Sequence, residues 1–342
     1  MEIQYTRYRL TCTHPFGISR STHDWYDVLY VYVHQDGITG RGEAAPSERY
    51  GEFPDQIEAR LRSGIELPRI DGPPEDYQAE LELLSGGIHS LKAALDTALW
   101  DWWAQKQGRP LYELFHSRPD QAPCSSFTIA IGDFDLLAQK VAEAEPYRIL
   151  KVKLGTNRDK EIITEIRKHT DKTLRVDANE GWDLDRAREM VPWLADRGVE
   201  LIEQPLPTNR LEDTARLKAL SPIPLIADEN CLTGADIPSL ADSFHGINIK
   251  LMKCGGLTEA RTMIATAREL GLLVMVGCMI ESSVGISAMA SLAPQIDFAD
   301  LDGHVLIDND PYEGMKLVEG KITLSNRPGL GVRLTLEGGG LR

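Results

Sequence analysis

The sequence predicts an α/β fold in which a (β/α) barrel is joined to an N-terminal α+β capping domain. After Pro123, short apolar segments alternate with amphipathic segments, which is the pattern of parallel strands connected by helices. Successive apolar segments lie 23 to 26 residues apart, close to one βα unit each, and eight such units make a closed barrel. The eight predicted strands are centred on Thr128, Val152, Val176, Ile202, Ile226, Ile249, Val274 and Phe298.

The chain before Pro123 has a different pattern. Residues 2–10 and 28–33 are rich in β-branched and alternating apolar residues, which predicts two strands. Asp36-Gly37 has the chemistry of a hairpin turn. From Leu91 to Trp103, apolar residues recur at offsets of three and four, which predicts a helix.

These patterns divide the 342 residues into two domains. We predict that residues 1–118 form the α+β capping domain and that residues 119–309 form the barrel. Strand and turn character returns near the C-terminus, so we expect about residues 310–342 to pack on the capping domain and complete it.

Composition narrows the function. Thirty-seven basic and 52 acidic residues give a net charge of −15, which argues against binding to nucleic acid or an anionic membrane. The five cysteines are scattered without CxxC spacing, so neither a disulfide framework nor structural zinc is predicted. The first residues lack a signal-peptide pattern, so we expect a cytoplasmic location. The oligomeric state is left open, a homo-oligomer included.

Carboxylates end three adjacent predicted strands. Active sites of such barrels lie at the carboxyl ends of the strands, and Asp177, Glu203 and Asp228 end the third, fourth and fifth. Three carboxylates on one rim would repel one another unless a hard, oxygen-preferring cation such as Mg²⁺ bound between them. Taken singly, each could instead pair with a lysine or cap a helix, but their matching positions favour a metal site.

Two lysines are predicted to face each other across the barrel mouth. Lys153 ends the second strand and Lys250 the sixth, which are opposite in a ring of eight. This placement suits a 1,1-proton transfer, in which one lysine removes a proton from a carbon and the other returns one to the opposite face. The cation would stabilise the enediolate that forms beside a carboxylate, and Lys151, on the same strand face, would lower the pKa of Lys153 by repulsion.

The strand-end segments resemble the muconate-lactonising subgroup of the enolase superfamily over nearly the whole chain. The matching segments are Lys151-Val152-Lys153, Asp177-Ala178-Asn179, Ile202-Glu203-Gln204-Pro205, Ala227-Asp228-Glu229 and residues 249–256. Residues 277–283 and Asp300-Leu301-Asp302-Gly303 further resemble dipeptide epimerases, of which the L-Ala-D/L-Glu epimerases are the familiar members. The resemblance implies a modified TIM barrel and an isomerase with one Mg²⁺ per site, or Mn²⁺ in its place. In this superfamily a lysine or histidine base works with Mg²⁺.

The resemblance also implies roles for individual residues. It assigns Lys153 and Lys250 as the acid/base pair and Asp177, Glu203 and Asp228 as metal ligands. It places Asn179 and Glu229 in support of those ligands. The substrate-binding residues that we expect are Lys151, Thr128, Cys278, Met279 and the pair Asp300 and Asp302. Two carboxylates at i and i+2 on one strand face would clamp the amino group of a dipeptide.

Side-chain specificity is less determined. We expect the loops at residues 16–24 and 45–52 to close over the barrel and contact the substrate side chain. Arg20 could bind a glutamyl carboxylate or be a plain surface residue. Ile18 and Tyr50 could line a pocket for an apolar side chain. Together with the acidic residues of the same loops, they could instead line a pocket for a cationic side chain.

Other functions share part of this pattern. An N-acylamino acid racemase, an o-succinylbenzoate synthase or a muconate cycloisomerase would have the same lysines and metal ligands. The aspartate pair argues against them, because a substrate without an amine would leave Asp300 and Asp302 buried and unpaired. A catalytically silent, ligand-binding barrel is a further alternative, against which the complete set of lysines and carboxylates speaks.

Overall fold

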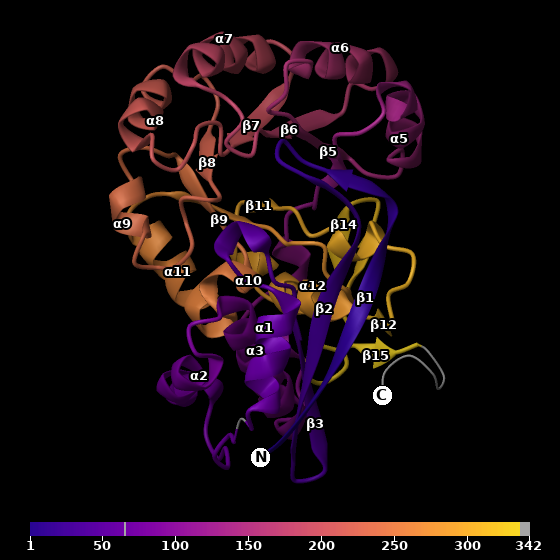
Figure 1. The fold of residues 1–342 in the computed structure, drawn as a ribbon, viewed down its shortest axis with the longest axis vertical. Coiled ribbons are helices and arrows are strands. Elements are labelled where there is room, and N and C mark those ends of the chain that lie inside the picture. The colour runs from indigo at the N-terminus through magenta and orange to yellow at the C-terminus, as the bar shows by residue number, and fades with distance from the viewer. Residues whose placement is uncertain (65, 336–342) are drawn as a thin grey trace.

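Eight parallel strands form a barrel in a computed structural model that describes residues 1–64 and 66–335 (Figure 1). The strands follow one another around the sheet in chain order, and an isolated parallel bridge between Ser125 and Ala299 joins the first strand to the last. Every predicted strand centre lies in a strand, and the barrel closes as predicted. The strands are β4 (Phe127–Ile129), β5 (Ile149–Lys153), β6 (Thr173–Asp177), β7 (Val199–Glu203), β8 (Leu225–Ala227), β9 (Gly246–Ile249), β10 (Leu273–Val276) and β11 (Phe298–Ala299).

Helices surround the barrel (Figure 1). They are α5 (Leu137–Glu143), α6 (Asp159–His169), α7 (Leu184–Ala195), α8 (Leu211–Lys218), α9 (Ile237–Leu240), α10 (Leu251–Cys254), α11 (Leu257–Glu269) and α12 (Ser283–Ala290). Two of them, α10 and α12, are buried throughout. In α6, Ile163 and Ile166 are buried against the sheet at a spacing of three. Within the described residues no α-helix follows β11, so the barrel is modified at its last unit.

The capping domain is an antiparallel sheet with helices packed on it. Its strands are β1 (Glu2–Gly17), β2 (Thr22–Gln35) and β3 (Ile38–Ala44), and its helices are α1 (Pro54–Arg62), α2 (Gln78–Ser85), α3 (His89–Lys106) and α4 (Leu111–Leu114). The Asp36-Gly37 turn has positive φ at both residues, as the hairpin prediction requires. A Cβ at Gly42 would lie 1.9 Å from the Ala94 carbonyl oxygen, so glycine allows α3 to approach β3 closely.

Strands β1 and β2 are longer than predicted. We expected strands at residues 2–10 and 28–33, but the hairpin continues to Gly17 and Thr22 and reaches the barrel, where Gly17 pairs with Ile131. The predicted loop at residues 16–24 is therefore mostly strand, with a tight turn in which the Ile18 amide donates to the Ser21 carbonyl. Long-range pairing, which local pattern does not reveal, extends the strands.

The C-terminal segment packs partly on the capping domain and partly on the barrel, where the Ser125 amide donates to the Gly320 carbonyl at 2.8 Å. It contains β12 (Tyr312–Glu313), β13 (Lys316–Val318), β14 (Lys321–Thr323) and β15 (Arg333–Leu334). The Tyr312 and Tyr32 hydroxyls are 2.9 Å apart, and the Leu330 amide donates to Asp101 of α3 at 2.8 Å. The prediction for residues 336–342 lies outside the described residues. No helix in the described part of the chain is both long and apolar enough to cross a membrane.

Candidate active site

Three buried carboxylates lie together at the carboxyl ends of adjacent strands. Asp177 and Glu203 end β6 and β7, Asp228 directly follows β8, and one carboxylate oxygen of each lies within 4.8 Å of the others. Burial, together with the charge of Asp177, raises the pKa of Glu203 to about 7. Glu203 Oε2 has no hydrogen-bond donor among the described residues, although Lys151 Nζ lies 2.6 Å away. The three carboxylates offer an all-oxygen ligand set, which fits Mg²⁺.

The two predicted acid/base lysines come from opposite sides of the barrel. Lys153 ends β5, Lys250 directly follows β9, and three strands separate β5 from β9 in either direction. Lys153 Nζ donates to Asp177 Oδ2 at 2.7 Å, and Lys250 Nζ donates to Asp228 Oδ2 at 2.7 Å. Burial acts to lower the pKa of Lys250, but attraction to Asp228 and Glu203 outweighs burial and raises it.

Two further lysines are almost completely buried beside these carboxylates. Lys151 Nζ lies 2.6 Å from Glu203 and 2.7 Å from Asp300. It therefore bridges the cluster of three predicted metal-binding carboxylates and the aspartate pair that is predicted to bind the substrate amine. Lys253 Nζ donates to Asp228 Oδ1 at 2.5 Å and to the Asn248 carbonyl at 3.0 Å. Lys253 belongs to the segment 249–256 that carries the family resemblance, but no role was assigned to it from the sequence. Lys253 lies three residues after Lys250, on the one-turn helix α10. This spacing is the sequence feature that could have placed it at the site.

The aspartate clamp differs from its prediction in two respects. Strand β11 ends at Ala299, so Asp300 and Asp302 lie in the following segment rather than on one strand face. Neither is unpaired: Asp300 accepts hydrogen bonds from Ser126 Oγ and Lys151 Nζ, both at 2.7 Å, and Asp302 accepts one from the Thr128 amide at 2.6 Å. Burial and the nearby Asp300 nevertheless raise the pKa of Asp302 to about 7, because its charge is poorly compensated.

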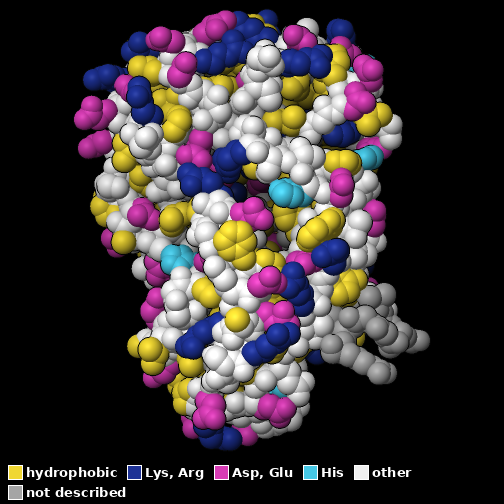
Figure 2. Space-filling model, in the orientation of Figure 1, with side chains coloured by type: hydrophobic (Ala, Val, Ile, Leu, Met, Phe, Trp, Pro, Cys, Tyr) yellow, Lys and Arg dark blue, Asp and Glu magenta, His cyan; other side chains and the backbone are white. Residues whose placement is uncertain are grey.

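A cavity of about 590 Å³ lies between the barrel mouth and the capping domain. Figure 2 shows this face hollowed between the barrel above and the capping domain below, with Lys or Arg side chains (dark blue) beside the hollow. The lining includes both acid/base lysines, Asp228, Asp300 and Asp302. It also includes the other predicted substrate-binding residues except Lys151, namely Thr128, Arg20, Ile18, Tyr50, Cys278 and Met279.

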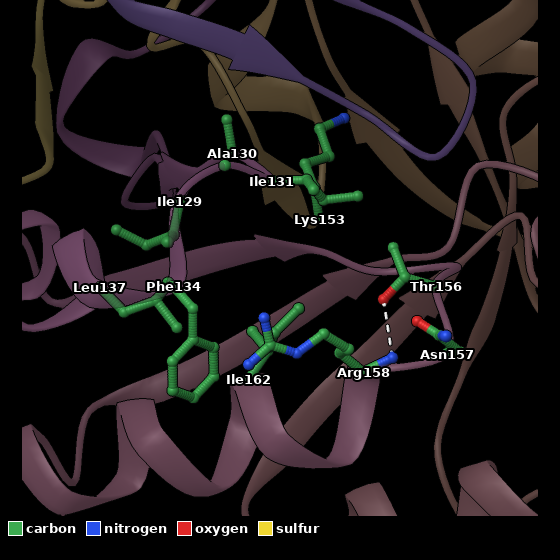
Figure 3. Close-up of a pocket in the computed structure, with 11 residues that line it drawn as sticks. Ile129, Ala130, Ile131, Phe134, Leu137, Lys153, Thr156, Asn157, Arg158 and Ile162 are labelled. Atoms are coloured by element: carbon green, nitrogen blue, oxygen red, sulfur yellow. Dashed lines mark hydrogen bonds between the residues drawn. The ribbon is translucent and has the colours of Figure 1, made fainter.

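A second, smaller cavity of about 210 Å³ lies between the loops that follow β4 and β5 (Figure 3). Apolar side chains such as Phe134 and Ile162 line it, and the Arg158 amide donates to Thr156 Oγ1 at 3.1 Å. Lys153 lines both cavities, but its amine points away from Phe134 and Ile162 (Figure 3). The smaller cavity therefore contacts the stem of Lys153 and not its reactive end.

Arg20 connects the hairpin tip of the capping domain to residues beside the carboxylate cluster. Its guanidinium lies 2.8 Å from Glu229 Oε1 and donates to the Asn179 carbonyl at 2.9 Å. The Asn179 amide donates to Asp177 Oδ1 at 2.9 Å, and its side chain reaches Glu229 Oε1 at 3.3 Å. Asn179 therefore contacts the predicted metal ligand Asp177, and Glu229 contacts Asn179.

The fold and the site together define a divalent-metal barrel enzyme with two opposed lysines. Residues 133–338 match the enolase C-terminal domain-like family, and residues 2–115 match the mandelate racemase / muconate lactonizing enzyme N-terminal domain. The chain belongs to the enolase superfamily, in the group that mandelate racemase and muconate lactonizing enzyme define.

Several similar proteins of known function are dipeptide epimerases. The chain is 40% identical to the L-Ala-D/L-Glu epimerase of Bacteroides thetaiotaomicron, over 97% of this chain and 88% of that protein. It is 40% identical to the L-Ala-D/L-amino acid epimerase of Maribacter sp., over 98% and 99% of the two chains. Among solved structures, the dipeptide epimerase of Methylococcus capsulatus with Mg and L-Arg-D-Lys superposes with a TM-score of 0.90 at 32% identity, covering 97% of this chain and 98% of that one.

Proposed function

We propose that this protein is a Mg²⁺-dependent dipeptide epimerase that inverts the α-carbon of the C-terminal residue. The observation that carries the proposal is the placement of Lys153 and Lys250 on opposite sides of a cavity that also contains Asp228 and Asp302. The names of the relatives support the choice of a dipeptide over other carbon acids.

In the proposed reaction each lysine acts on one face of the α-carbon. Lys153 Nζ removes the α-proton of one epimer, and Lys250 Nζ donates a proton to the opposite face; the reverse reaction exchanges their roles. When bound, the ion supplies positive charge that stabilises the negative charge developing on the substrate carboxylate. Asp177 holds the Lys153 amine and Asp228 holds the Lys250 amine, so the carboxylates of the cluster also position the two amines.

The amino end of the dipeptide would bind at the other side of the cavity. A substrate ammonium beside Asp302 would compensate a buried charge that the Thr128 amide alone compensates poorly. Lys151 already neutralises Asp300, so we assign Asp302 the larger share of ammonium binding. Cys278 and Met279 would form the adjoining wall.

Deuterium exchange tests the proposal directly. Purified protein with Mg²⁺ in D₂O is mixed with an L,L-dipeptide library, and mass spectrometry follows deuterium gain at the α-carbon. The variant with both Lys153→Ala and Lys250→Ala is the control and should show no gain. Exchange in N-acyl amino acids and in no dipeptide would retain the two-lysine chemistry and reject the dipeptide.

A further inference from the structure

Arg20 is a capping-domain cation that lines the cavity, and residues of the barrel already compensate its charge. It contacts Glu229 at 2.8 Å, Glu180 at 3.3 Å and the Asn179 carbonyl at 2.9 Å. These partners come from the segments that follow β6 and β8, and the Glu229 side chain is 1% exposed. Removing Arg20 from this contact to bind a substrate carboxylate would leave the buried Glu229 without its cation.

The other charged capping residues around the cavity are also engaged. Arg49 donates two hydrogen bonds of 3.0 Å to Glu180. Glu52 accepts from the His89 and Ser90 amides at 2.6 and 3.1 Å, so its carboxylate caps the N-terminus of α3.

Asp27 is engaged in the same way. It is buried between Arg7 at 2.6 Å and Arg9 at 2.8 Å. Asp55 pairs with Arg7 and is exposed, and His23, Asp24 and Glu48 are exposed at the rim.

The cavity wall between these engaged groups is apolar. The capping domain contributes Phe16, Ile18, Tyr26 and Tyr50, and the barrel contributes Met279 and Leu306. The Phe16 ring centroid lies 5.9 Å from Lys153 Nζ, so the apolar surface begins beside one of the two acid/base groups. A side chain attached to the reacting carbon would meet this surface first.

We infer that the residue whose α-carbon inverts carries an uncharged, mainly apolar side chain, and that Arg20 is a positioning residue that holds the hairpin tip on the barrel. The inference rests on the proposed function, because it concerns the substrate of that site. Inside the cavity, away from the exposed rim, a charged side chain would lose its hydration and meet only the charged capping residues that are already engaged. An apolar side chain would bury surface there against Phe16, Ile18 and Tyr50. A volume of about 590 Å³ leaves room for a long side chain.

Isosteric dipeptides separate charge from size. L-Ala-L-Met, L-Ala-L-Gln and L-Ala-L-Glu have second side chains of similar length, and L-Ala-L-Lys adds the opposite charge. We expect kcat/KM for L-Ala-L-Met to exceed that for L-Ala-L-Glu and L-Ala-L-Lys by about 30-fold, with L-Ala-L-Gln between them. A charged dipeptide turned over as well as L-Ala-L-Met would overturn the inference and leave the proposed function intact. Absence of exchange with every dipeptide would overturn both.

Replacement of Arg20 tests its role independently. Arg20→Met should lower kcat about tenfold for every dipeptide alike, because a misplaced hairpin affects the site and not one side chain. Arg20→Lys should recover part of kcat, since one hydrogen bond to Glu229 remains feasible. Selective loss of L-Ala-L-Glu turnover in Arg20→Met would identify Arg20 as a substrate ligand and overturn the inference.

A matched control and a second readout complete this test. Arg268→Met removes an arginine from an ion pair on the outside of the barrel, with Asp297, and should leave kcat unchanged. If Arg20→Met does not fold, binding to the Lys153→Ala variant decides the question. L-Ala-L-Met should raise the Tm of the Lys153→Ala variant more than L-Ala-L-Glu does. The opposite order would overturn the inference.

Discussion

The barrel rim and the capping domain both bring many charged residues to the same cavity, but they use them differently. At the rim, Asp177, Asp228 and Glu203 are crowded by lysines within hydrogen-bonding distance, and their charges are directed at the place where chemistry would occur. In the capping domain, Arg20 and Glu52 anchor the polypeptide, and apolar side chains line the cavity. If the rim supplies the reacting groups and the cap selects the substrate side chain, as we propose, substitutions in the two regions should have different effects.

The largest effect is expected at the rim lysines. Lys153→Ala and Lys250→Ala should each lower epimerisation at least about 10³-fold, because each removes the only base or acid for one face. Each variant should still exchange the α-proton of one epimer with D₂O through the remaining lysine, which proton NMR would detect. Lys168→Ala, at an exposed lysine of α6, is the control. Full epimerisation in both rim variants would exclude a two-base mechanism.

A smaller effect is expected at the amine end of the cavity. Asp302→Asn should raise KM for dipeptides about 30-fold, because a neutral amide binds an ammonium less strongly than a carboxylate does. Mg²⁺ affinity, measured by calorimetry, should change little, since Asp302 is not in the carboxylate cluster. Loss of Mg²⁺ binding in this variant would show that the metal position is misassigned.

Asp302 should also make the free energy of unfolding depend on pH. The pKa of Asp302 is about 7 in the folded protein against an ordinary value of 3.8, so the folded state holds the proton more tightly than the unfolded state. Stability therefore falls as pH rises from about 4 to about 7, and the loss is complete above that range. Asp302→Asn, which stays neutral, should be more stable than the parent by about 2 kcal/mol at pH 8 and by much less at pH 4. Equal Tm differences at both pH values would contradict this assignment.

The smallest effect is expected in the cap. Glu52→Gln weakens the bonds to the α3 N-terminus and should lower stability by about 1 kcal/mol, measured by urea unfolding. Turnover of dipeptides should stay within about threefold of the parent, because Glu52 anchors the loop and does not bind substrate. A large loss of turnover at unchanged stability would show that Glu52 contacts the substrate and does not merely anchor the loop.

The parts of the molecule that sequence predicts well are those governed by local repetition. The eight strands follow from a regular spacing of apolar segments, and the rim residues follow because strand ends converge in a barrel. Lys153 and Lys250 were placed opposite each other by counting strands alone. The Asp36-Gly37 turn and helix α3 likewise depend on neighbouring residues.

Side-chain partners could not be predicted, because they join distant parts of the chain. Arg20 and Glu229 are 209 residues apart, and Asp300 meets Lys151 across 149 residues. No spacing rule connects such pairs, so Arg20 remained a candidate ligand and the clamp was expected to be free. The length of the β1–β2 hairpin was missed for a similar reason, since its tip is stabilised by the barrel residue Ile131.

The return of the C-terminal segment to the capping domain has a consequence for synthesis. Asp101 of α3 is buried and accepts from the Arg41 and Leu330 amides, and burial raises its pKa to about 6. Leu330 is translated 229 residues after Asp101. The capping domain is thus translated first but completed last. Until the whole barrel has been translated, Asp101 lacks the hydrogen bond from the Leu330 amide.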